Sequence, residues 1–242
     1  MRVRVTVAYD GTDFLGFQRQ ATGRTVQEVL ETALERIAGR PTRVLAAGRT
    51  DTGVHAEGQV IAFDTAWRHG LPDLERAMNA VLPQDVAVRD PGQVAPDFHP
   101  RYAARSRRYR YTVYNAAVRS PVARRTSLHC KGALDLEAMQ TATGLAVGEH
   151  DFAAFGRPTQ GEVTVRRVIE AGWQAEPPWL TFEIEANAFL FRMVRSIVGT
   201  LLQVGQGRLS PDAFGAVLAS RDRSRAGQTA PAHGLCLIRV RY

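Results

Sequence analysis

Cysteine is scarce in this sequence, and long apolar runs are missing. Its 242 residues include two cysteines, Cys130 and Cys236, which lie far apart and show no CxxC or Cys/His ligand spacing. This spacing is unlike a disulfide framework or a zinc site and predicts two thiols in a reducing compartment. No apolar run approaches about 18 residues, the minimum for a membrane span, and the sequence opens on a predicted strand rather than a signal peptide. We therefore expect a cytoplasmic protein.

Lysine is almost absent, and the positive charge is carried by arginine. Lys131 is the only lysine among 31 basic residues, which outnumber 24 acidic residues and give a net charge of +7 at pH 7. A basic surface attracts polyanions because each neutralised phosphate releases counterions. Arginine also binds phosphate bidentately and stacks on bases, although GC-rich coding alone can enrich it. Charge by itself leaves nucleic-acid binding and simple solubility both open.

The first hundred residues predict the element order of a ferredoxin-like unit. Residues 3–9 alternate with period two and end at Asp10-Gly11, which predicts a strand. Thr25 and Glu28 form a capping box that opens a helix. The expected elements are strands near 3–9, 42–47, 58–64 and 86–89, and helices near 26–38 and 72–81. Their order is β-α-β-β-α-β, which favours a ferredoxin-like arrangement.

The remainder of the chain repeats this order loosely. Its expected elements are strands near 104–115, 163–174, 179–186 and 235–241, and helices near 135–146, near 187–204 and from Ser210-Pro211 onward. No sequence repeat links the two halves, so the symmetry follows from element order alone. We expect an α+β fold of two ferredoxin-like halves, residues 1–103 and 104–242. We also expect a mainly antiparallel sheet and a central active-site cleft.

A polar loop between two predicted strands, Gly48–His55, carries an arginine, an aspartate and a histidine. It is not a phosphate loop, because Val54-His55 stand where Lys-Ser/Thr is required. A metal site could use Asp51, His55 and Glu57, and an extended chain after Gly53 would put the last two on one face. However, nothing nearby offers the further carboxylate that a metal-dependent hydrolase normally needs. Alternatively Asp51 caps a plain turn. The residues alone favour that turn over a catalytic Asp51.

Aromatic residues make up only 8% of the chain, so their cluster within residues 101–111 stands out. On a strand, Arg105, Arg107, Tyr109 and Tyr111 face one way, and Arg108 and Arg110 the other. Aromatic rings beside guanidinium groups are the chemistry that holds an unstacked base over its phosphate backbone. A strand with core tyrosines and solvated arginines is the alternative.

The predicted helix that begins near Phe189 has a stripe of small and basic residues. Arg192, Arg195, Ser196 and Gly199 share this stripe because residues three and four apart are neighbours on a helix. Gly199 would let another segment approach closely. Arg195 would then be placed to reach a carboxylate, or it is simply a surface arginine.

Taken together, several short segments resemble the tRNA pseudouridine synthase A family over almost the whole chain. They are Tyr9-Asp10-Gly11-Thr12 with Phe14-x-Gly16-Phe17-Gln18, Thr25-Val26-Gln27, Ala47–His55, Asp97–Arg101, Arg108–Tyr111 with Tyr114-Asn115, Asp151-Phe152, Asn187–Phe189 with Met193–Arg195 and Val198-Gly199, and Thr229–Pro231 with Gly234-Leu235. The stretches Phe191-Arg192 and Phe155–Thr159 depart from the family pattern.

The resemblance implies a cofactor-free and metal-free isomerisation of uridine to pseudouridine. In the family the nucleophile matches Asp51, a pairing arginine Arg195, a base-flipping arginine Arg49 and a base-stacking tyrosine Tyr109. Arg107, Arg110 and His55 are further expected substrate contacts. The implied partners are tRNA, modified at nucleotides 38 to 40 of the anticodon arm, and a second copy of the chain in a homodimer. A non-catalytic RNA-binding protein and a metal-dependent RNA hydrolase remain the alternatives.

Overall fold

The computed structural model describes residues 1–159 and 161–242 and divides into two compact units. The first comprises Met1–Arg105 and Leu237–Tyr242, and the second comprises Ser106–Cys236. The sequence predicted a division between residues 103 and 104, which is close to the boundary after Arg105. It also assigned the whole C-terminal strand to the second half. Most of that strand belongs to the first unit because it packs on the strand containing Gly58, where a Cβ would lie 2.1 Å from the carbonyl oxygen of Ile238.

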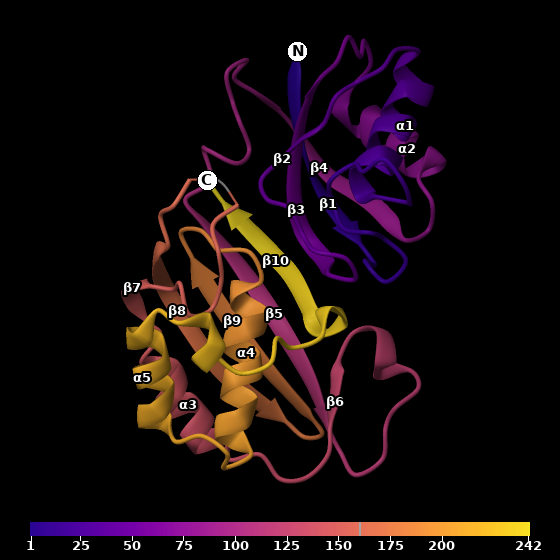
Figure 1. The fold of residues 1–242 in the computed structure, drawn as a ribbon. Coiled ribbons are helices and arrows are strands. Elements are labelled where there is room, and N and C mark those ends of the chain that lie inside the picture. The colour runs from indigo at the N-terminus through magenta and orange to yellow at the C-terminus, as the bar shows by residue number, and fades with distance from the viewer. Residues whose placement is uncertain (160) are drawn as a thin grey trace. The chain divides into compact units, whose positions relative to one another are not determined.

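The first unit has the predicted order of elements and a ferredoxin-like sheet. Its elements are β1 (Arg2–Tyr9), α1 (Val26–Ala38), β2 (Leu45–Ala46), β3 (His55–Asp64), α2 (Leu71–Val81) and β4 (Val86–Val94), with most of β10 (Leu235–Arg241). The strand order is β4-β1-β3, with β2 and β10 both next to β3. Strand β1 is antiparallel to β3 and β4, and β2 is antiparallel to β3. The two helices lie close to each other beside the strands (Figure 1).

The second unit is a mainly antiparallel sheet with three α-helices against it (Figure 1). Its elements are β5 (Ser106–Asn115), β6 (Leu128–Cys130), α3 (Leu136–Gly144), β7 (Gly148–Asp151), β8 (Val165–Glu176), β9 (Trp179–Ala186), α4 (Met193–Gly205) and α5 (Pro211–Ser220). The order β5-β9-β8-β7 is antiparallel throughout, and the short β6 pairs parallel to β5. The core between sheet and helices contains fully buried Phe155, Phe182 and Phe214. The predicted α+β class and mainly antiparallel pairing are confirmed.

Two features of the second unit differ from the sequence prediction. The helix expected from 187 begins only at Met193, because Arg192 adopts a left-handed conformation with φ 63° and ψ 9°. The preceding backbone makes other hydrogen bonds: Asn187 donates to the Arg167 carbonyl at 3.1 Å, and Phe191 donates to that of Arg157 at 2.9 Å. The short strands β6 and β7 were not predicted, since three or four residues show no period.

No helix in the described part of the chain is long and apolar enough to cross a membrane.

Candidate active site

The loop Gly48–His55 joins β2 to β3 in the first unit and contains a tight turn. The Val54 amide donates to the Asp51 carbonyl at 3.1 Å, and Gly53 has a positive φ of 76°, as a turn residue in this position requires. The predicted turn is therefore present. However, the hydrogen bond that closes it uses the backbone of Asp51, not its carboxylate. The Asp51 side chain is half-buried, and Arg49 is exposed.

The loop rests on the segment that follows β1. The Phe17 amide donates to the Thr50 carbonyl at 3.1 Å. A Cβ on Gly16, whose φ is 95°, would lie 2.8 Å from that carbonyl oxygen, and a Cβ on Gly11 would lie 2.0 Å from the Val54 carbonyl oxygen. Glycine is required where two backbones approach this closely. Two segments that are far apart in the sequence thus pack closely against each other.

His55 is buried beneath the loop and not presented on its surface. Its Nδ1 accepts the Gly11 amide at 3.1 Å and lies 3.1 Å from a carboxylate oxygen of Asp10. The pairing of β1 with β3 is irregular here, so His55 is buried while Glu57 is exposed. The two side chains therefore have different environments. Within residues 1–159 and 161–242, no three His, Cys, Asp or Glu side chains are close enough to hold a metal ion.

The two tyrosines of β5 have different environments. Tyr111 is fully buried, its hydroxyl donates to the Pro231 carbonyl at 2.9 Å, and burial raises its pKa. Tyr109 is only half-buried, and Phe189 packs edge-on against its ring with centroids 5.0 Å apart. A partly exposed ring that a second aromatic holds in place is suited to stacking on a base. The core-tyrosine alternative is thus right for Tyr111, not for Tyr109.

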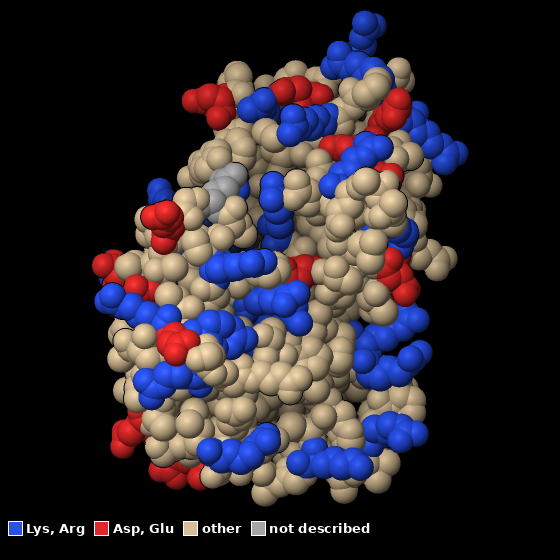
Figure 2. Space-filling view, viewed as in Figure 1, with Lys and Arg blue, Asp and Glu red and all other residues tan. Residues whose placement is uncertain are grey.

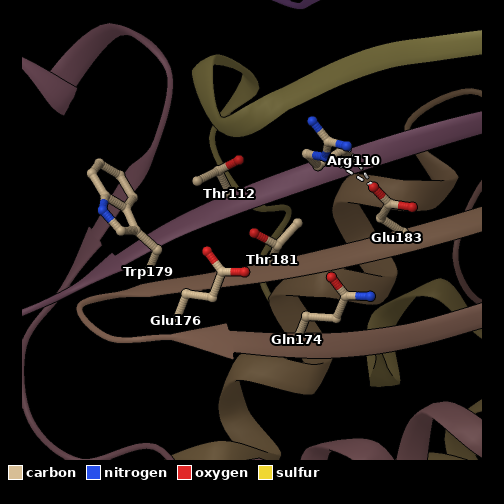
Figure 3. A pocket seen from close by; sticks show the side chains of 7 residues that line it. All are labelled: Arg110, Thr112, Gln174, Glu176, Trp179, Thr181 and Glu183. Atoms are coloured by element: carbon tan, nitrogen blue, oxygen red, sulfur yellow. Dashed lines mark hydrogen bonds and ion pairs between the residues drawn. The ribbon is translucent and has the colours of Figure 1, made fainter.

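The arginines of β5 alternate between the two faces of the sheet, as predicted. Arg108 pairs with Glu183 and Glu185, each at 3.0 Å. Arg110 donates to Glu183 at 2.9 Å, and both side chains project from the sheet in Figure 3. Arg110 and Glu183 line a hollow of about 390 Å³ together with other residues of β5, β8 and β9. Arg110 therefore does not share a surface with Tyr109, whereas Arg107 is on the Tyr109 face and donates to the Asn187 carbonyl at 2.8 Å.

Arg195 lies in the first turn of α4, where a neighbouring segment holds it. Its Nε donates to the Ala230 carbonyl at 2.8 Å, and the Ala230 amide donates back to the Arg195 carbonyl at 3.0 Å. A Cβ on Gly199 would lie 1.8 Å from the Gln228 carbonyl oxygen, so the predicted close approach is confirmed. The sequence did not reveal the support that Ala230 gives Arg195 or that Phe189 gives Tyr109. Ala230 and Phe189 belong to the segments that resemble the family, but only the structure shows which residues they contact.

Basic side chains are spread widely over the face of the molecule in Figure 2, and acidic side chains are fewer. Exposed Arg119, Arg124 and Arg125 lie in the segment between β5 and β6. This distribution agrees with the net charge of +7 and gives the surface the character that attracts a polyanion.

Comparison with known proteins adds the chemistry. A family model described as tRNA pseudouridine synthase matches residues 5–103 and 142–242. The tRNA pseudouridine synthase A of Chloroflexus aurantiacus is 50% identical over 246 residues, which cover 99% of this chain and 88% of its own. Those of Geotalea uraniireducens and Moorella thermoacetica are 44% and 45% identical, covering 100% and 99% of this chain and 99% of each of theirs.

Among solved structures, a chain of a Cbf5-Nop10-Gar1 complex matches with a TM-score of 0.41 and 14% identity, over 97% of this chain and 48% of that one. This chain thus spans about half the length of that chain, a likeness too distant to bear on function. The sequence matches do bear on the family, because they extend over nearly the full length of this chain and of each relative. The resemblance found from the motifs is confirmed. The chain belongs to the tRNA pseudouridine synthase family, isomerases that convert uridine to pseudouridine in tRNA.

Proposed function

We propose that this chain isomerises uridines at nucleotides 38 to 40 of the anticodon arm of tRNA, with Asp51 as the nucleophile. The Asp51 carboxylate bonds transiently to the nucleotide, the glycosidic bond between N1 and C1′ breaks, and the detached base turns. C5 then bonds to C1′, the carboxylate is released, C5 loses its proton and N1 gains one. The reaction conserves every atom of the nucleotide except the exchanged proton and needs no redox step. One carboxylate held in a fixed loop can serve such a reaction. The fixed backbone on both sides of the half-buried Asp51 is the observation that carries the proposal.

Arg195 is proposed as the counter-charge that pairs with the Asp51 carboxylate and orients it. Support comes from the clamp on Arg195: its Nε donates to the Ala230 carbonyl, which fixes the direction of the planar guanidinium. The motif resemblance supplies the pairing itself.

Tyr109, Arg49 and Arg107 are proposed to handle the target nucleotide. Extracting a base from a helix costs a few kcal/mol, and an exposed arginine such as Arg49 can offset part of this by replacing lost stacking or by contacting phosphate. The half-buried ring of Tyr109 would stack on the extracted base. Arg107 shares the face of Tyr109 and would contact the backbone beside it. The buried position of His55 gives it a role in holding the loop.

The proposed partners are tRNA and a second copy of the chain, in the cytoplasm. The net charge of +7 supports an RNA substrate. The homodimer follows from the resemblance, and sedimentation equilibrium across a hundredfold range of protein concentration would test it. A concentration-independent monomer mass would contradict the dimer.

The direct test of the function is pseudouridine mapping in tRNA that lacks the modification. Protein alone, in buffer with excess EDTA, is expected to form pseudouridine within nucleotides 38 to 40. Product elsewhere in the tRNA would contradict the site, and activity that EDTA abolishes would favour a metal-dependent mechanism. Binding of tRNA without any product would favour the non-catalytic RNA-binding alternative, which the basic surface also supports.

A further inference from the structure

A buried pair of hydroxyl groups connects the loop Gly48–His55 to the first strand. The phenol oxygen of Tyr9, at the end of β1, is 2.8 Å from Oγ1 of Thr50. Tyr9 is 4% exposed and Thr50 is 7% exposed, so neither side chain offers a surface to RNA. Thr50 immediately precedes Asp51. A side chain on the first strand therefore reaches the residue next to the proposed nucleophile.

The ring of Tyr9 is itself held firmly. Its backbone pairs with Ala56 on β3 and with Val86 on β4, and its ring lies 6.5 Å from that of Phe14 and 6.4 Å from that of Phe17. A phenol hydroxyl in such apolar surroundings costs free energy unless it is hydrogen-bonded. The rigid ring thus gives the hydroxyl one defined position, at Thr50.

Thr50 is fixed at two points. Its carbonyl accepts the Phe17 amide, and its Oγ1 bonds the Tyr9 phenol. Because a β-branched residue has few χ1 choices, holding Oγ1 also restricts the backbone of Thr50. On the other side of Asp51, the Val54 amide closes the turn. The Asp51 backbone is therefore held between two anchored positions.

We infer that Tyr9 is a positioning residue for the isomerisation. Its hydroxyl fixes Thr50 and, through the backbone, the direction of the Asp51 carboxylate. This inference rests on the proposed role of Asp51. A misplacement of about 1 Å at a reacting group can lower a rate about 100-fold, so a single buried hydrogen bond here affects the chemical step more than it affects RNA binding.

The test is a set of steady-state measurements on undermodified tRNA. Tyr9→Phe keeps the ring and removes only the hydroxyl, so kcat is expected to fall about 10- to 100-fold while KM for tRNA changes less than about twofold. Thr50→Val removes the other hydroxyl and should have a similar effect, whereas Thr50→Ser retains the bond and most of the activity. The two losses should not multiply in the double variant, because both remove one interaction.

Tyr242→Phe is the matched control. Its hydroxyl donates to the Pro100 carbonyl at 3.0 Å in the same unit, outside the loop and the segment beneath it, so its loss should leave kcat unchanged. The inference is overturned if Tyr9→Phe lowers the melting temperature but keeps the wild-type kcat, or if the Tyr9 and Thr50 effects multiply. If Tyr9→Phe does not fold, Thr50→Val against Thr50→Ser gives the same decision. A wild-type protein that forms no pseudouridine would instead refute the proposed function.

Discussion

At the scale of single residues, the site depends on glycines that allow two backbones to meet. Gly16→Ala would force a side chain into a φ of 95° and place its Cβ 2.8 Å from the Thr50 carbonyl oxygen. Strained backbone of this kind costs about 1–3 kcal/mol, and relief of the contact would move Thr50. We expect an unfolding free energy lower by about 2 kcal/mol, measured by urea denaturation, together with reduced activity.

Gly132→Ala provides the control for this change. Gly132 also has a positive φ, of 85°, but a Cβ there would meet no atom within 4 Å. It should therefore show the backbone strain without the contact and keep full activity. Equal losses of stability and of activity in both variants would mean that the approach of Gly16 to Thr50 has no special role.

The direction of side chains along a strand could be predicted from the sequence, whereas the long-range contacts of those side chains could not. Alternation along a strand separated Tyr109 from Arg110, because side-chain direction depends only on local geometry. The same pattern could not separate Tyr109 from Tyr111, which share a face but differ in burial through Pro231 and Phe189. Nor could it reveal that His55 points at Gly11, since this contact joins segments 44 residues apart.

At the scale of elements, an ion pair joins the segment between β1 and α1 to the residues between α2 and β4. Arg24 binds both carboxylate oxygens of Asp85, at 2.5 and 2.8 Å, and its guanidinium lies 4.0 Å from the centroid of the Phe14 ring. The hydrogen bonds from Arg24 lower the pKa of Asp85 below its usual 3.8. The pair therefore connects the beginning of α1 with the end of α2 and with the aromatic ring under the loop.

This pair predicts an acid-dependent loss of stability. A carboxyl group with a lowered folded-state pKa stabilises the fold above the unfolded-state value, here 3.8, and that contribution disappears as the pH falls through the folded-state pKa. Asp85→Asn should thus reduce the unfolding free energy near neutral pH and have a diminishing effect as the pH falls below 3.8. Urea denaturation at several pH values would measure this. In a protein that already carries Arg24→Met, Asp85→Asn should cause no such pH-dependent change in the unfolding free energy. If the change persists there, the pairing of Arg24 with Asp85 is contradicted.

Element boundaries could be predicted from the sequence where a helix cap or a hydrophobic period marks them, but not elsewhere. Thr25 accepts the Glu28 amide at the start of α1, which is the N-cap bond of the predicted capping box, and Gly39 ends that helix with a left-handed φ of 68°. The start of α4 was wrong by several residues, because Arg192 and the bridge from Phe191 to Arg157 stop the helix from extending backwards. The contacts of β10 with the first unit are long-range, and no local pattern encodes them.

At the scale of the whole molecule, the charge predicts salt-sensitive binding of tRNA. Each phosphate contact that is lost should reduce the slope of log K against log salt by about one. Arg107→Gln, on the face of Tyr109, is expected to weaken binding and reduce this slope. Arg110→Gln, on the opposite face and paired with Glu183, should change neither. Filter binding across a salt series measures both, and equal effects of the two variants would contradict the assignment of faces.

The central claim is that Asp51 performs chemistry and does not merely complete a turn. The most direct measurement compares wild-type protein with Asp51→Asn on undermodified tRNA, recording both pseudouridine formed and tRNA bound. The turn uses the backbone of residue 51, so the isosteric amide should leave the loop and the binding constant nearly unchanged. We predict no pseudouridine from Asp51→Asn under conditions in which the wild type converts its substrate completely. Turnover by Asp51→Asn at the wild-type rate would contradict the account.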